Sequence, residues 1–446
     1  MSEYSNHTAS TVSLSHIESP DYFYNAILAF LGFSLLFFII LAKAKGAAGL
    51  SSSPFLLVYT VLVTSFELSR IISAMFYNNL IHNKVRDQSE LIQDEFEPTV
   101  TFVIPCKNEE KTIAKTIQKS FASNYPADKL EVIIINDGST DNTISVLRDL
   151  QKEFPALIVI DWEINQGKRH GMAAGIREAK GEIIVQLDSD SYIEPDTFYE
   201  IIEPFRNKKI GAVCAHADPE NADENFLTKM QAAYYFLSFR ILKAAESTLY
   251  TVFCCSGCSS AYRKSLIEPI LDEWLAEKFL GLPVTWGDDR ALTNWVLRQG
   301  YKTIYTDRTQ AYTICPNNFK QLMKQQIRWK KGWFVNSIFA SKFIWKEQPF
   351  VAFTYFFPLI FITLITPFMA SKALLYNTIV EGNSPILYVS GIFLVAALVT
   401  IYYRYIARKN KYWPYVFAWS ALNMVVLSFV LFYAIGTIQN RKWGTR

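Results

Sequence analysis

Two adjacent carboxylates followed by an arginine have types and a spacing that suit chemistry. They are Asp288, Asp289 and Arg290, directly after Gly287. A carboxylate in such a group can take a proton from a hydroxyl, and the arginine can bind an anion. Asp288, Asp289 and Arg290 are therefore the predicted catalytic residues.

A second polar group follows on a segment with helical character. Gln325, Arg328 and Trp329 have a spacing that places them on roughly one side of a helix. A guanidinium binds phosphate or hydroxyl oxygens, and an indole packs against the C–H face of a sugar. Together with the carboxylates, this group predicts a reaction on sugars that carry a phosphate leaving group.

Further carboxylates occur earlier in the chain. Glu109 and Asp137 each lie in a short polar cluster, and the glycine after Asp137 permits a tight turn in which the carboxylate accepts hydrogen bonds. Asp188 and Asp190 lie on the same side of an extended backbone. Such a pair suits Mg²⁺ or Mn²⁺ bridging a diphosphate, because hard cations prefer oxygen ligands. We predict a metal site at Asp188 and Asp190.

Buried strands and intervening helices would position these carboxylates. Apolar, β-branched runs predict strands at residues 99–104, 132–135, 157–161 and 183–187, with helices at 111–120 and 143–152. Strands that alternate with helices predict an α/β domain with a mostly parallel sheet covered on both faces. Ligands of such sheets bind beyond the carboxyl ends of the strands, which is where the polar clusters fall.

The composition indicates a membrane protein. Half of the 446 residues are apolar, 19% are charged, and the net charge of +3 is too small to indicate a nucleic-acid partner. Apolar segments long enough to cross a bilayer occur at residues 22–42, 54–77, 349–370, 385–406 and 413–438.

The number of these segments conflicts with the sides of the membrane that the neighbouring charges indicate. Basic residues between the last two segments and in the tail favour the cytoplasm for both regions. Five spans would instead place the two termini on opposite sides. We therefore predict that one of the last three segments is re-entrant or interfacial, and Pro358 and Pro367 indicate the first of them.

The order of the polar groups resembles that of the family 2 glycosyltransferases, and among them the membrane-embedded processive synthases with a QxxRW motif. More narrowly, the chain resembles the hyaluronan synthases. The matching segments are residues 167–170 (GKRH), 279–283 (FLGLP), 287–290 (GDDR), 292–294 (LTN), 324–329 (KQQIRW) and 443–446 (WGTR). The resemblance covers residues 99–333 strongly and the membrane segments by layout only.

The resemblance implies a GT-A-like nucleotide-sugar fold. It implies that uridine binds near Asp137, that Asp190 is the more direct of the two metal ligands, and that Asp289 is the general base for the acceptor hydroxyl. The residues expected to bind substrate or nucleotide are Glu109, Asp137, Lys168, Arg169, Asp188, Cys255, Ser256, Gln325, Arg328, Trp329, Trp443, Thr445 and Arg446. Lys168 and Arg169 would add positive charge near the diphosphate, and the WGTR tail would close over the nucleotide. Cys258 stands where hyaluronan synthases usually have proline, so the acceptor-side wall is expected to differ.

The predicted layout follows from the resemblance and the apolar segments. It comprises a disordered tail (1–20), two transmembrane helices (21–78), a linker (79–98), a cytoplasmic glycosyltransferase domain (99–318), interfacial helices with QxxRW (319–347), transmembrane or re-entrant helices (348–438) and a cytoplasmic WGTR tail (439–446). The expected location is the plasma membrane, with several spans.

The predicted function is a processive, inverting glycosyltransferase that polymerises UDP-sugars and secretes the polysaccharide, with hyaluronan made from UDP-glucuronate and UDP-N-acetylglucosamine as the first choice. Its partners would be the UDP-sugars, the growing polymer, the lipid bilayer and Mg²⁺ or Mn²⁺, with no nucleic acid and no obligatory protein partner. The alternatives are a glucose–glucuronate capsule polymer, chitin or poly-N-acetylglucosamine. A channel or transporter with a degenerate domain, and a single-addition lipid-linked glycosyltransferase, are less favoured because the complete set of carboxylates and QxxRW would serve no purpose there.

Overall fold

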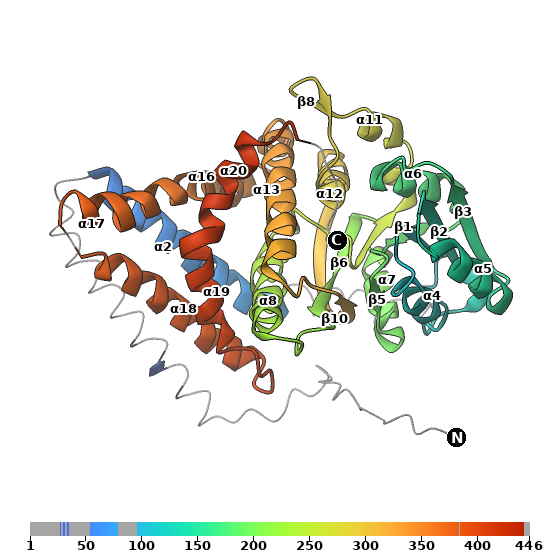
Figure 1. Ribbon diagram of the computed structural model, residues 1–446, viewed down its shortest axis with the longest axis horizontal. Helices are drawn as coiled ribbons and strands as arrows, with labels where there is room; N and C mark the ends of the chain where they lie inside the picture. Colours follow the sequence, from blue (N-terminus) through green and yellow to red (C-terminus); the bar gives the residue numbers. More distant parts are fainter. Residues whose placement is uncertain are drawn as a thin grey trace.

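A computed structural model describes residues 27, 30, 31, 34, 54–78, 96–382 and 384–440. Most of the first predicted membrane segment, and the predicted nucleotide-binding residues Trp443, Thr445 and Arg446, lie outside the described residues. Figure 1 shows an α/β domain beside a group of long helices.

Eight strands form the main sheet of the α/β domain. Their bounds are β1 Val100–Cys106, β2 Leu130–Asp137, β3 Leu157–Trp162, β4 Ile183–Gln186, β5 Ser191–Ile193, β6 Ile210–Pro219, β7 Ser260–Arg263 and β10 Lys302–Thr313. The order across the sheet is β3-β2-β1-β4-β7-β6-β10-β5. β1 to β4 are parallel, as are β6 and β10, whereas β7 and β5 are antiparallel to their neighbours. The predicted mostly parallel α/β fold is confirmed.

Helices cover the sheet and separate it from the membrane part. They are α4 Ile113–Phe121, α5 Thr143–Glu153, α6 Lys168–Glu178, α7 Tyr199–Ile202, α8 Phe226–Leu237, α9 Ala244–Thr248, α10 Lys264–Ile267, α11 Leu271–Leu275, α12 Asp288–Arg298 and α13 Phe319–Ser341. A π-helical turn, η5 (Ser238–Lys243), joins α8 to α9. A hairpin of β8 (Lys278–Phe279) and β9 (Leu282–Pro283) precedes α12.

Close packing of α6 on the sheet sets the position of the residues at its N-terminus. Every residue of β1 is buried, as expected for a parallel strand covered on both faces. A Cβ added to Gly175 of α6 would lie 2.5 Å from Cγ1 of Val103, so only glycine allows this approach. The contact holds the first residue of α6, Lys168, at the edge of the sheet where the parallel strands end.

The remaining helices are called the membrane part below, because three candidate spans lie among them. They are α2 Pro54–Met75, α14 Ile344–Glu347, α15 Pro349–Val351, η6 Ala352–Phe356, α16 Phe357–Ser371, η7 Lys372–Tyr376, α17 Asn377–Ile379, α18 Ile386–Ile406, α19 Tyr415–Leu422, η8 Asn423–Leu427 and α20 Ser428–Gly436. Three continuous helices within the described ranges are long and apolar enough to cross a membrane, at Pro349–Ile379, Tyr388–Ile406 and Tyr415–Gly436.

The first of these three helices contains the segment that is predicted to be re-entrant. It continues for 31 residues through Pro358 and Pro367, so the two prolines do not divide it into two shorter helices. The structure therefore does not support the reason for choosing this segment as re-entrant. The number of spans and the side on which each terminus lies stay predictions.

Aromatic stacking joins the membrane helices to the α/β domain. Tyr234 of α8 stacks on Trp419 of α19 with ring centroids 4.4 Å apart, and Phe236 stacks on Tyr403 of α18 at 3.8 Å. In Figure 1, α13 lies between α20 on the membrane side and α12 on the domain side, and it contacts both. The boundary between the two parts is thus a packed interface formed by α8 and α13.

Candidate functional site

A cavity of about 420 Å³ lies where the ends of the strands meet α8, η5, α12 and α13. The predicted site residues that line it are Lys168, Asp188, Asp190, Ser256, Asp288, Asp289, Arg290, Gln325, Arg328 and Trp329. Residues from both halves of the predicted site, which lie far apart in the sequence, therefore share one cavity. Glu109, Asp137, Arg169 and Cys255 do not line it.

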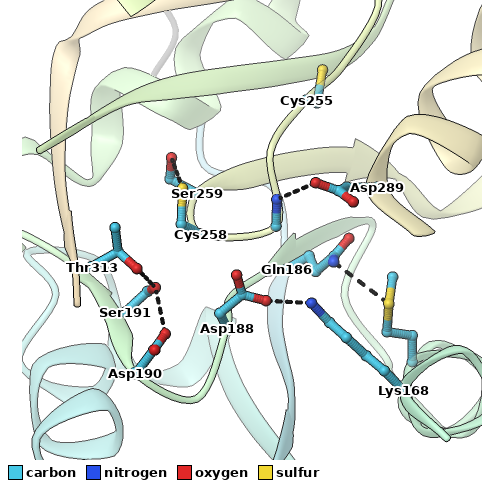
Figure 2. A network of polar contacts seen from close by, with 12 residues as sticks. Lys168, Gln186, Asp188, Asp190, Ser191, Cys255, Cys258, Ser259, Asp289 and Thr313 are labelled. Carbon is cyan, nitrogen blue, oxygen red and sulfur yellow. Dashed lines mark hydrogen bonds and ion pairs between the residues drawn. The ribbon is translucent and has the colours of Figure 1, made fainter. Parts of the chain in front are cut away.

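One side of the cavity carries the paired carboxylates that follow β4. Figure 2 shows Lys168 Nζ donating to Asp188 Oδ1, and Asp190 Oδ1 accepting from Ser191 Oγ at 3.2 Å. Among the described residues, no group of three or more His, Cys, Asp or Glu side chains could hold a metal ion. Two carboxylates nevertheless fit a Mg²⁺-type ion, because such ions commonly take one or two carboxylates and complete their shell with phosphate oxygens and water.

Asp289 lies across the cavity in the first turn of α12. Gly287 precedes the helix in a left-handed conformation with φ of 69°, which directs the first turn into the cavity. Asp289 Oδ2 accepts from the backbone N–H of Gly257 at 3.0 Å, as Figure 2 shows. A carboxylate in the first turn is also stabilised by the helix dipole. The hydrogen bond and the start of the helix thus hold the Asp289 carboxylate at the cavity, where it can meet a hydroxyl.

Asp288 and Arg169 form a buried ion pair at the start of α12. Arg169 Nε donates to Asp288 Oδ1 at 2.8 Å, and its Nη1 pairs with Glu277 at 2.9 Å. Its guanidinium also lies 5.0 Å from the ring centroid of Trp274. Arg169 therefore does not line the cavity and fixes the start of α12, and its contact with a diphosphate stays a prediction.

Asp137 and Glu109 lie at the ends of β2 and β1, outside the cavity. Asp137 is buried and accepts from the backbone N–H groups of Gln166 at 2.6 Å and Gly167 at 2.9 Å. Glu109 accepts from Thr112 Oγ1 at 2.6 Å. Asp137 thus shapes the loop that leads into Lys168, and its contact with uridine stays a prediction.

The turn at residues 254–258 places different side chains in the cavity from those predicted. Cys255 is fully buried and its backbone N–H donates to Thr293 Oγ1 at 3.0 Å, so this thiol points away. Cys254, which we had not predicted, lines the cavity, and its Sγ lies 4.0 Å from Asp289 Oδ2. Ser256 lines the cavity as predicted and accepts a hydrogen bond from Lys243 Nζ.

The QxxRW residues occupy one face of α13, as their spacing predicts. Gln325 is 9% exposed, and its Oε1 accepts no hydrogen bond from any described residue. Trp329 is 36% exposed. A buried amide oxygen without a donor and a half-open indole are both suited to a sugar, which offers hydroxyl donors and an apolar face.

A contact between two glycines sets the distance from Asp289 to this face. A Cβ added to Gly332 of α13 would lie 2.9 Å from the Cα of Gly287, and one added to Gly287 would lie 2.8 Å from Asn336 Nδ2. Helices α12 and α13 therefore meet backbone to backbone. This contact therefore sets the position of the Asp289 carboxylate relative to the QxxRW face of α13.

Comparisons with known proteins agree with this arrangement. The sequence model "Glycosyl transferase family 2" matches residues 101–271. A hyaluronan synthase of Streptococcus pyogenes serotype M1 is 32% identical over 359 residues, covering 78% of this chain and 83% of the relative. The chain belongs to glycosyltransferase family 2 and is related to the hyaluronan synthases. The expected hyaluronan synthase-like glycosyltransferase is therefore confirmed at the level of the family.

Other relatives of this glycosyltransferase are more distant. An N-acetylglucosaminyltransferase of Azorhizobium caulinodans is 24% identical over 398 residues, covering 87% of this chain and 96% of the relative. The solved structure of a mannosyltransferase from Pyrobaculum calidifontis, in complex with GDP-Man and Mn²⁺, covers 85% of this chain and all of that one with a TM-score of 0.53 and 18% identity. The latter likeness confirms the GT-A-like fold alone.

Sequence reasoning missed several residues that line the cavity of this glycosyltransferase. Tyr234, Tyr235 and Phe239 lie at helical spacing on α8 and η5, a pattern typical of packing residues, yet they form part of its wall. Lys243 also lines it. The predicted site residues in the turn at 254–258 could have indicated them, because the helix before a turn that lines a cavity can line the same cavity.

Proposed function

We propose that this protein is a processive, inverting glycosyltransferase that makes hyaluronan from UDP-glucuronate and UDP-N-acetylglucosamine and secretes it across the plasma membrane. The observation that carries the proposal is the placement of one cavity at the junction with the membrane helices. Asp188 and Asp190 line one side, and Asp289 and Trp329 line the other. The relationship to hyaluronan synthases supports the choice of sugars.

In the proposed reaction, Asp289 acts as the general base. The acceptor hydroxyl oxygen attacks C1 of the donor sugar while the bond from C1 to the diphosphate breaks, and the hydroxyl proton passes to Asp289. UDP leaves with the bonding electrons. The Gly257 N–H on Oδ2 orients the carboxylate, which leaves Oδ1 for the proton.

Asp188 and Asp190 would hold Mg²⁺ or Mn²⁺. The ion would neutralise the charge that develops on the departing diphosphate. Lys168 already pairs with Asp188 and would contribute its positive charge beside the same phosphates. Arg328 and Gln325 line the cavity near Trp329 and would hold the diphosphate or acceptor hydroxyls.

Secretion requires that the cavity open towards the membrane helices. Trp329 lies on α13, which contacts α20 of the last candidate span. We propose that the acceptor chain passes Trp329 and leaves between these helices, with the α/β domain in the cytoplasm. A membrane protein with three candidate spans agrees with this layout.

Purified membranes incubated with UDP-sugars singly and in pairs test the proposal. Long polymer is expected only from UDP-glucuronate with UDP-N-acetylglucosamine, and hyaluronidase should degrade it completely. Polymer from either sugar alone, or polymer that resists the enzyme, would contradict hyaluronan as the product.

The relationship to N-acetylglucosaminyltransferases supports a second candidate, the polymerisation of N-acetylglucosamine alone. The same experiment separates the two. Product from UDP-N-acetylglucosamine as the only donor would favour the second candidate, and product from UDP-glucose with UDP-glucuronate would indicate a capsule polymer.

A further inference from the structure

Lys243 is a buried cation in the cavity wall that the proposed reaction has not used. It is the last residue of the π-helical turn η5, in the middle of a continuous helix from Phe226 to Thr248. It lines the cavity although it is only 7% exposed. π-helical turns occur frequently at functional sites, because they redirect side chains that a regular helix would place elsewhere.

The contacts of Lys243 within the described residues include no carboxylate. Its Nζ donates to Ser256 Oγ and to Cys214 Sγ at 3.2 Å, and it lies 4.1 Å from the ring centroid of Phe239. Within the described chain, no carboxylate forms an ion pair with it. Burial raises the pKa of the Cys254 thiol to about 11 and raises that of Cys258 as well, so these neighbours are neutral near pH 7.

An ammonium without a carboxylate partner differs from two other cations near the cavity. Arg169 pairs with Asp288 and Glu277, and Lys168 pairs with Asp188. A buried lysine is rarely left without an anion, because removal of an isolated charge from water is costly. Since Lys243 borders the cavity, a ligand in the cavity can provide the missing charge.

The turn at residues 254–258 indicates which ligand lies close to Lys243. Ser256 of this turn accepts from Lys243, and the next residue, Gly257, donates to Asp289. Two hydrogen bonds, through the adjacent residues Ser256 and Gly257, therefore connect Lys243 to the carboxylate of Asp289, the proposed base for the acceptor. The diphosphate side has its own lysine, Lys168, beside Asp188.

We propose that Lys243 binds the carboxylate of a uronic acid unit when that unit is the acceptor. This inference rests on the proposed function, in which glucuronate alternates with N-acetylglucosamine. A chain that ends in glucuronate places its carboxylate in the cavity, and the lysine pairs with it. When the chain ends in N-acetylglucosamine, Ser256 remains the partner of the lysine.

Single additions to nascent chains held by the enzyme test this assignment. Membranes with bound polymer are incubated with an excess of one UDP-sugar, so that every chain ends in that sugar, and are then washed. The other UDP-sugar is added with a radioactive label, and the rate of one addition is measured. Wild-type enzyme should perform both additions.

Lys243→Met should slow the addition of N-acetylglucosamine to chains ending in glucuronate by roughly 10- to 100-fold, the value of a charge-assisted hydrogen bond. The addition of glucuronate to chains ending in N-acetylglucosamine should change less than about threefold. Lys243→Arg should restore most of the first rate, and Lys243→Gln should not. Lys152→Met, at an exposed lysine on α5, serves as the matched control.

Equal slowing of both additions by the Met and Gln variants would overturn the proposal, and so would no slowing of either. Thermal unfolding and UDP binding of each variant show whether it is folded, and the Gln variant retains a polar contact for Ser256 if the Met variant is unstable. Failure of the proposed function is recognised separately, because wild-type membranes would then make no alternating polymer.

Discussion

The two sides of the cavity are built in different ways. Asp188 and Asp190 follow a strand of the parallel sheet, and Lys168 at the start of α6 pairs with Asp188. Asp289, Lys243 and Trp329 instead lie on helices that pack towards the membrane part. The proposed donor side is thus fixed by the sheet, whereas the proposed acceptor side is fixed by helix contacts. The variants below separate the two, from the largest expected effect to the smallest.

Asp289→Asn should have the largest effect. It removes the proposed base but keeps the size of the side chain, so the rate of polymer synthesis should fall by about 10³-fold. UDP binding, measured by calorimetry, should stay within about threefold of the wild type, because the donor side is untouched. Retained synthesis would remove Asp289 as the base, and lost UDP binding would show that the two sides are not separable.

Asp190→Asn is the corresponding change on the donor side. Synthesis should fall by about 10²-fold, since the charge of the diphosphate is less well neutralised. The Mg²⁺ or Mn²⁺ concentration for half-maximal rate should rise. Ser191→Ala removes the hydrogen bond to Asp190 without removing a carboxylate, and it should change that concentration only slightly. An unchanged metal dependence in the Asn variant would exclude Asp190 as a ligand.

Gly332→Ala changes the contact between α12 and α13 without altering any polar group in the cavity. The added methyl would lie 2.9 Å from the Cα of Gly287, so the helices must move apart and Asp289 must shift relative to Trp329. Synthesis should fall by about 10-fold, since small displacements of reacting groups are costly. Gly391→Ala on α18, where nothing lies within 4 Å of the added atom, is the control and should be fully active.

Tyr355→Phe should have the smallest effect. Tyr355 of η6 donates to the half-buried carboxylate of Glu246 at 3.0 Å. Glu246 also accepts from the N–H of Phe253, next to the turn at 254–258. Loss of one hydrogen bond should lower the free energy of unfolding by about 1 kcal/mol. Thermal unfolding should show a decrease of about 2 °C with synthesis nearly unchanged. A loss of synthesis as large as that of Gly332→Ala would instead assign this contact to the acceptor side of the site.

The sheet and the carboxylates at its edge could be predicted from the sequence, because buried parallel strands are continuous apolar runs and their ends are marked by polar residues. The spacing of Gln325, Arg328 and Trp329 likewise predicted one face of α13, since this helix is regular. The contacts of Arg169 could not be predicted from the sequence, because only the tertiary structure brings Asp288 and Glu277 next to it.

The residues on the acceptor side of the cavity could not be predicted from the sequence, and the physical reason is a different one. The π-helical turn η5 changes the direction of the side chains after it, so the regular period of 3.6 residues does not predict that Lys243 lines the cavity. In the turn at 254–258, a shift of one residue decides whether Cys254 or Cys255 faces the substrate. Such a register depends on contacts like that of the Cys255 N–H with Thr293, which no local pattern reveals.

Tyr234 lines the cavity and also stacks on Trp419 of the last candidate span. A transmembrane helix changes its tilt when the thickness of the surrounding bilayer changes. Such a movement would reach Tyr234 through Trp419 and through the other contacts between α8 and α19. The acyl-chain length of the lipids used for reconstitution is therefore expected to change the rate of synthesis.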